Sequence, residues 1–172
     1  MQKILYLILL IFGSCLVGCQ NKAKKIIEGN RLTPYEAVVA YVYDGDSFKA
    51  KSQGINIQVR LFGIDAPEKK QLYGKESKQN LFKLIKYKRG IIQPIETDKY
   101  GRLIAKVYTK KNGVKTYINL EQIKAGLAWH YKRYAKNEKD LAKAELYAKK
   151  HKLGLWQHSN PIKPEKWRIK HD

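Results

Sequence analysis

The sequence contains few cysteines, the residues that cross-link small proteins covalently, and few methionines or prolines. Its 172 residues include 2 cysteines, 1 methionine and 5 prolines. Both cysteines, Cys15 and Cys19, lie in an apolar N-terminal stretch, so the rest of the chain has neither a disulfide framework nor a cysteine zinc site. The four histidines also lack the spacing of metal ligands. The folded part must therefore be stabilised by packing.

Acidic residues are scarce as well. The chain has 15 aspartates and glutamates against 35 lysines and arginines, which gives a formal net charge of +20. Such a surface attracts phosphate polymers and anionic membranes. A hydrophobic content of 44% excludes disorder of the whole chain, and the length suits a single hydrophobic core.

The start of the chain has the layout of a secretory signal. Lys3 precedes an apolar run from Ile4 to Val17, and the next charged residue is Lys22. A spanning helix needs roughly 17 to 25 residues, and the run is short for that, although an uncleaved anchor is the alternative.

Residues 16–19, with the sequence LVGC, resemble the bacterial lipoprotein box, in which a small residue precedes a cysteine that receives lipid. We therefore expect a signal peptide over 1–18, lipidation of Cys19 and a polar tether over 19–35. Cys15 is the rival site and fits the box less well. The expected location is extracytoplasmic, on the cell membrane or the outer membrane.

Hydrophobic patterning predicts an α+β fold. Segments rich in β-branched and aromatic residues predict five strands, and apolar residues at helical spacing predict three helices. This set suits a small closed barrel with a helical cover. We expect the working domain over 36–157 and a basic C-terminal tail over 158–172. The predicted strands are 37–43, 48–51, 55–62, 91–95 and 103–109, and the predicted helices are 73–88, 119–125 and 139–150.

Four carboxylates gather in this otherwise basic chain. Asp44, Asp46, Asp65 and Glu68 fall within positions 44–68, where three basic residues oppose them. Clustered carboxylates repel one another unless protons or a metal relieve them, and a hard cation such as calcium prefers oxygen ligands. The alternative is that the aspartates only cap backbone amides in turns, which is the simpler explanation for the first turn taken alone. The spacing does not continue as an EF-hand.

Several ordered elements resemble the staphylococcal nuclease family. The family pattern has an aspartate in a turn, an arginine fourteen positions later, an Asp-x-Pro-Glu element and a second arginine element. Two glycine-containing segments follow, and the resemblance covers roughly residues 36 to 157. The matching elements are 44–47, Arg60, 65–68, 98–102, 126–128 and 154–156.

The resemblance implies an OB-fold barrel and calcium-dependent cleavage of DNA and RNA that leaves 3′-phosphate ends. It implies calcium bound by Asp46, Asp65 and the backbone carbonyl of Ala66, with Glu68 as the general base. Ser47 stands where the family turn has threonine, and it keeps the hydroxyl group. Ala66 replaces the threonine of some members, which a carbonyl ligand tolerates.

The resemblance also implies that Arg60 and Arg102 bind the phosphate. Negative charge grows on the phosphate oxygens as water attacks, and a planar guanidinium matches two of those oxygens in a way that lysine cannot. The candidate contacts to the rest of the substrate are Lys99, Tyr100, Tyr131 and Tyr134.

Two other functions fit part of the pattern. A non-catalytic OB-fold lipoprotein could hold nucleic acid electrostatically, because one fold can bind without cutting. An envelope-attached interaction protein could use its positive charge to engage anionic surface polymers. The complete set of carboxylates and arginines favours the nuclease, which we expect to act as a monomer.

Overall fold

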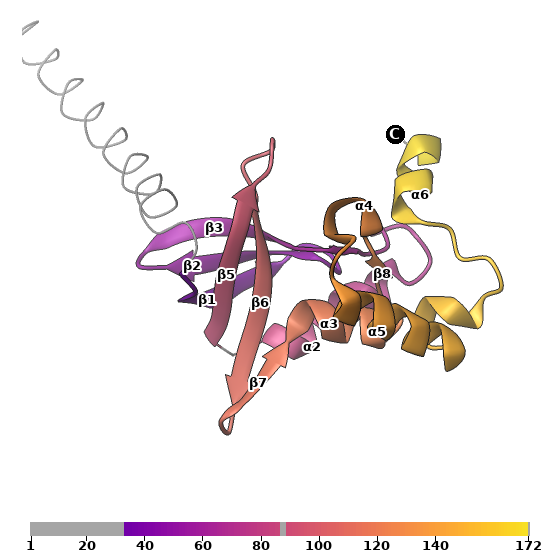
Figure 1. The fold of residues 1–172 in the computed structure, drawn as a ribbon. Coiled ribbons are helices and arrows are strands. Elements are labelled where there is room, and N and C mark those ends of the chain that lie inside the picture. Colours follow the sequence, from indigo (N-terminus) through magenta and orange to yellow (C-terminus); the bar gives the residue numbers. More distant parts are fainter. Residues whose placement is uncertain (1–32, 87–88, 172) are drawn as a thin grey trace, which may run out of the picture. The chain divides into compact units, whose positions relative to one another are not determined.

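The computed structural model describes residues 33–86 and 89–171. The predicted signal peptide, the lipidation site at Cys19 and most of the tether therefore lie outside the described residues. The described residues from Pro34 onward belong to one unit, whose barrel and helices are drawn in Figure 1. Within this part of the chain, no helix combines the length and apolar character needed to cross a membrane.

The barrel is built from five strands: β1 (Tyr35–Val42), β2 (Ser47–Ser52), β3 (Ile55–Leu61), β5 (Arg89–Thr97) and β6 (Leu103–Lys111). They pair in the order β3-β2-β1-β5-β6, and a parallel pairing of β3 with β6 closes the ring. A further strand, β7 (Val114–Tyr117), pairs with β6 as a hairpin. The closed five-stranded barrel and the α+β class are confirmed.

Alternating burial explains why these segments form the barrel. In β6, Leu103, Ala105 and Val107 are buried, and the residues between them are only partly covered. The pairing of β5 with β6 shifts register between Pro94 and Glu96. Such an irregularity bends a strand, and it allows a proline inside a paired strand.

The three predicted helices are present as α2 (Gly74–Ile85), α3 (Ile118–Lys124) and α5 (Lys139–Lys150). The structure adds elements that the sequence analysis does not predict. The tail, for which the sequence predicts only positive charge, contains a helix. Besides β7, the additional elements are β4 (Ile64–Asp65), β8 (Trp129–His130), α4 (Lys132–Ala135), the 3-10 helix η1 (Gly154–Gln157) and α6 (Pro164–His171).

Helix α3 packs against β6 and α5 and fixes two turns at the end of the barrel. The fully buried Gln122 donates a hydrogen bond of 2.6 Å from Nε2 to the carbonyl of Gly45. Asn119, also fully buried, donates from Nδ2 to the carbonyl of Phe62 over 2.8 Å. Buried amides of this kind are costly to leave unpaired, so the two turns are held in place by one helix.

Candidate functional site

The predicted site residues come together in one cleft of about 790 Å³ at this end of the barrel. It is lined by the turns that follow β1 and β3, by the turn between β5 and β6, and by residues of the C-terminal third of the chain. The sequence-predicted residues in its lining are Asp46, Arg60, Asp65, Ala66, Glu68, Lys99, Tyr100, Arg102, Tyr131 and Tyr134.

The two aspartates of the first turn have different surroundings. Asp44 is a turn cap, because its Oδ1 accepts hydrogen bonds from the backbone N–H of Asp46 over 3.1 Å and from the Ser47 hydroxyl over 2.7 Å. Asp46 is buried, and its Oδ2 accepts a 2.7 Å hydrogen bond from the backbone N–H of Ala66. The turn explanation therefore accounts for Asp44, whereas Asp46 joins the first turn to the second.

Arg60 bridges the carboxylates of the two turns. It lies in β3 opposite Ser47, which brings it beside the first turn. Its Nη1 forms an ion pair with Asp46, and its Nη2 donates to Oδ1 of Asp65 over 2.9 Å. Burial acts to lower the pKa of Arg60, but the neighbouring Asp46 and Asp65 raise this pKa above its ordinary value. This guanidinium is a permanent cation in the floor of the cleft.

Burial makes the ionised form of Asp46 unfavourable even with Arg60 beside it. Burial raises the pKa of Asp46 from 3.8 to about 7; Arg60 opposes this rise, and Asp44 and Asp65 add to it. A carboxyl group in this position favours a second cation nearby. In residues 33–86 and 89–171, no group of three or more His, Cys, Asp or Glu side chains is arranged to hold a metal ion. A metal at Asp46 and Asp65 would therefore need further ligands, such as a backbone carbonyl or water.

Arg102 is held at the rim by the turn between β5 and β6. Its Nε donates to Oδ2 of Asp98 over 2.8 Å, while Oδ1 of Asp98 accepts from the backbone N–H groups of Tyr100 and Arg102. Burial acts to raise the pKa of Asp98, but these hydrogen bonds outweigh burial and lower the pKa below its ordinary value of 3.8. The Arg102 guanidinium lies 5.4 Å from the centre of the Tyr100 ring. Asp98 thus orients Arg102 through Nε.

Glu68 faces a residue that the sequence analysis misses. Its Oε1 accepts a 2.5 Å hydrogen bond from Nη1 of Arg168 in α6, and Nη2 of Arg168 lies 3.4 Å from Oδ2 of Asp65. Arg168 is 100 positions from Glu68, so no local spacing predicts the contact. The one feature of the sequence that could have drawn attention to Arg168 is that it is the single arginine among the four lysine and arginine residues after Asn160.

The two predicted tyrosines form the wall next to Asp65. Tyr131 and Tyr134 meet edge to face with ring centres 5.0 Å apart, and Tyr134 is exposed. Burial and the neighbouring Asp65 raise the pKa of Tyr131 above its ordinary value. Exposed aromatic faces of this kind are suited to stacking on nucleobases.

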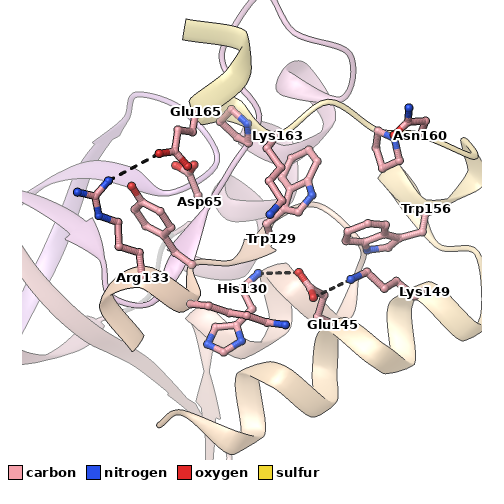
Figure 2. Close-up of a pocket in the computed structure, with 14 residues that line it drawn as sticks. Asp65, Trp129, His130, Arg133, Glu145, Lys149, Trp156, Asn160, Lys163 and Glu165 are labelled. Carbon is pink, nitrogen blue, oxygen red and sulfur yellow. Dashed lines mark hydrogen bonds and ion pairs between the residues drawn. The ribbon is translucent and has the colours of Figure 1, made fainter. Parts of the chain in front are cut away.

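A second pocket, of about 380 Å³, borders the cleft and shares Asp65 and Tyr131 with it (Figure 2). At its base the buried Glu145 accepts hydrogen bonds from the backbone N–H of His130 over 3.1 Å and from Nζ of Lys149 over 2.8 Å. His130 itself lies 2.8 Å from the carbonyl of Ala135 through Nε2. These contacts tie α5 to β8, which pairs with the strand that carries Asp65.

Comparisons with known proteins identify the family to which the chain is similar. Residues 58–158 match the family model described as "Staphylococcal nuclease homologue". An "Uncharacterized endonuclease" of Haemophilus influenzae is 39% identical over 131 residues, which is 76% of this chain and 71% of that protein. A protein of Escherichia coli with the same description is 34% identical over 130 residues, 76% of this chain and 82% of that protein.

A "Staphylococcal-like nuclease" of Arabidopsis thaliana is 41% identical over 111 residues, which is 64% of this chain. The match spans only 33% of that plant protein, so this chain corresponds to about one third of it. The family match covers more than half of the present sequence, and the two bacterial relatives align over most of their own length. The chain belongs to the staphylococcal nuclease homologue family.

Proposed function

We propose that this protein is a nuclease that hydrolyses phosphodiester bonds of DNA, RNA or both in the cleft around Asp46. The observation that carries the proposal is the meeting of Asp46, Asp65 and Glu68 with Arg60 and Arg102 in that one cleft. Carboxylates provide metal ligands and a general base, and guanidinium groups bind phosphate. The names of the bacterial and plant relatives support the same reaction class.

The residues around Asp46 fit a bound calcium ion. Asp46, Asp65 and the carbonyl of Ala66 offer the oxygen ligands that calcium prefers. Burial is the main cause of the raised pKa of Asp46, so the ionised carboxylate would be stabilised by a cation bound beside it. When bound there, calcium supplies Lewis-acid activation of a phosphate oxygen and helps to place the attacking water.

The protein's own side chains carry the other steps of the proposed reaction. Glu68 takes a proton from the attacking water, because a carboxylate within hydrogen-bond reach is a competent base. Arg60 and Arg102 stabilise the negative charge that develops on the phosphate oxygens. Cleavage of the bond between phosphorus and the 5′ oxygen leaves the phosphate on the 3′ side, and the released 5′ oxygen takes up a proton from water to become a hydroxyl.

The proposed function is tested with the purified domain from Gln20 onward and a labelled single-stranded DNA. We expect cleavage in calcium, loss of cleavage when the calcium is chelated, and products that carry 3′-phosphates. Equal cleavage after chelation would remove calcium from the mechanism. Salt-sensitive binding without cleavage in calcium would instead support the non-catalytic nucleic-acid-binding protein.

We further propose that the nuclease acts outside the cytoplasm and is tethered by lipid at Cys19. The support is the LVGC sequence that ends an apolar run with one preceding lysine. Mass spectrometry of the N-terminus of the protein isolated from its own cells tests this, with a diacylglyceryl-modified Cys19 as the expected first residue. An unmodified Cys19 would contradict it.

A further inference from the structure

The C-terminal segment is attached to the loop that carries Glu68. The buried Gln71 joins the two, because its Oε1 accepts a 3.1 Å hydrogen bond from the backbone N–H of Glu68 and its Nε2 donates to the carbonyl of Ile162 over 2.5 Å. Nearby, the rings of Tyr73 and His158 meet edge to face at 5.8 Å. The segment that leads into α6 is therefore fixed against this loop before the helix begins.

Helix α6 then directs Arg168 into the cleft. Glu165, on the same helix, forms an ion pair with Arg133 of α4 (dashed line in Figure 2), with 3.7 Å between Oε1 and Nη1. From this position Arg168 contacts both ends of the 65–68 turn, through Nη1 to Glu68 and through Nη2 to Asp65. One planar guanidinium thus links Glu68 to one of the two aspartates that we assign to calcium.

Within the described residues, Arg168 is the one partner recorded for the Glu68 carboxylate. The side chain of Glu68 is 37% exposed, so packing alone does not fix its rotamer. A free glutamate side chain has several rotamers, and ordering it costs conformational entropy. A general base works only within hydrogen-bond reach of the water that it deprotonates.

The geometry of the ion pair leaves the base able to act. Arg168 binds Oε1, and a carboxylate has a second oxygen that can still accept a proton. The guanidinium stays charged and cannot itself take the proton, so it orients the carboxylate without competing for the reaction.

We propose that Arg168 is a positioning residue that holds Glu68 in the orientation required of the general base, and that helix α6 is therefore part of the active site. The inference rests on the proposed nuclease function and on Glu68 as its base. It assigns a task to the basic tail beyond general attraction to nucleic acid.

A double-mutant cycle tests the inference in the full chain. Single-turnover cleavage of labelled single-stranded DNA in calcium is measured for wild type, Arg168→Ala, Glu68→Gln and the double variant. We expect Arg168→Ala to lower the single-turnover rate constant at saturating enzyme by about tenfold, with little change in the enzyme concentration that gives half of that rate, because a misplaced catalytic group loses rate at the chemical step. In the Glu68→Gln background, Arg168→Ala should lower the cleavage rate by less than about twofold, because the base that Arg168 positions is already disabled.

Two further variants give the controls. Lys170→Ala removes the same charge from an exposed position of α6 and should leave the rate unchanged. Arg168→Lys should restore part of the rate, because it keeps the charge but loses the planar fork. An equal loss in both backgrounds would overturn the inference, and this is also the result expected if Arg168→Ala lowers the rate by unfolding the protein. No loss of rate, or faster cleavage by Arg168→Ala, would overturn it as well.

The same data separate this inference from the proposed function. Calcium-dependent cleavage by wild type, together with its loss in Glu68→Gln, supports the nuclease whatever Arg168 does. If wild type itself does not cleave, the proposed function fails, and the inference about Arg168 fails with it.

Discussion

Asp46 is the residue whose ionisation the fold alters most clearly. Its carboxyl is buried beside Asp44 and Asp65, and its pKa rises to about 7. A folded-state pKa above the unfolded value means that Asp46 favours folding at low pH, and that this contribution is lost as pH rises through about 7. At neutral pH the metal-free protein therefore loses stability by burying the ionised Asp46 carboxylate, and we expect a bound cation to offset that cost.

Replacement of Asp46 should expose that cost. We expect Asp46→Asn to raise the free energy of unfolding of the metal-free protein at about pH 8, on the order of 1 kcal/mol, and to lose this advantage toward about pH 4. Urea denaturation in a chelator measures it, and calorimetry should show weaker calcium binding by the variant. A wild type more stable than Asp46→Asn at the higher pH would contradict the assignment.

Arg102 tests whether the shape of a cation matters in addition to its charge. Asp98 holds its Nε, so the outer nitrogens can face the substrate phosphate. We expect Arg102→Lys to lower kcat/KM by about tenfold or more, because lysine keeps the charge but not the fork. Arg89→Lys is the matched control, since Arg89 is exposed on β5 and does not line the cleft. Equal rates for the two variants would argue against phosphate binding by Arg102.

The difference between Asp46 and Arg168 shows what the sequence can reveal at this scale. Asp46, Arg60 and Glu68 lie within one short stretch whose order and spacing can be compared with a family pattern. Arg168 reaches the cleft from a tail that the buried Gln71 attaches to the Glu68 loop. A contact between residues so far apart depends on tertiary packing, which local spacing does not record.

At the scale of elements, the first turn can approach the second only because position 45 is glycine. A Cβ atom on Gly45 would lie 1.8 Å from the Ser77 hydroxyl of α2 and 2.7 Å from Cβ of Ala66. The turn is thus packed directly against the helix and against the residue whose carbonyl we assign to calcium.

A methyl group at this position should disturb both stability and the site. We expect Gly45→Ala to destabilise the protein by about 1 to 3 kcal/mol, as overpacked substitutions do, and to weaken calcium binding. Thermal unfolding and calcium titration measure the two effects. Gly90→Ala is the control, because the nearest atom to a Cβ there is 3.7 Å away. Equal stability and calcium affinity for the two variants would contradict the packing argument.

The long regular patterns predicted their elements, whereas elements of two to four residues were missed, as was α6. The alternating residues of β6 and the helical spacing in α2 and α5 span many residues, and the structure has these elements close to the predicted positions. Strands β4 and β8 have two residues each and form only by pairing with each other. The buried amides of Asn119 and Gln122 support the site through backbone contacts that no sequence period indicates.

At the scale of the whole molecule, the charge of +20 should govern how fast substrate arrives. Counterion release makes such binding strongly dependent on salt. Between about 50 and 200 mM sodium chloride we expect kcat/KM on single-stranded DNA to fall by about tenfold or more, with kcat nearly constant. Steady-state kinetics at fixed calcium checks this, and a kcat/KM that does not change with salt would exclude an electrostatic role for the surface.

The central claim is that the cleft around Asp46 is a hydrolytic site in which Glu68 is the base. The measurement that tests it most directly is single-turnover cleavage of a labelled single-stranded DNA by wild type and Glu68→Gln, each with calcium and with chelator. We predict no cleavage by either protein in chelator, full-rate cleavage by wild type with calcium, and a residual rate about 100-fold or more lower for the variant with calcium, because its amide cannot take a proton. Cleavage by Glu68→Gln at the wild-type rate would contradict this account of the active site.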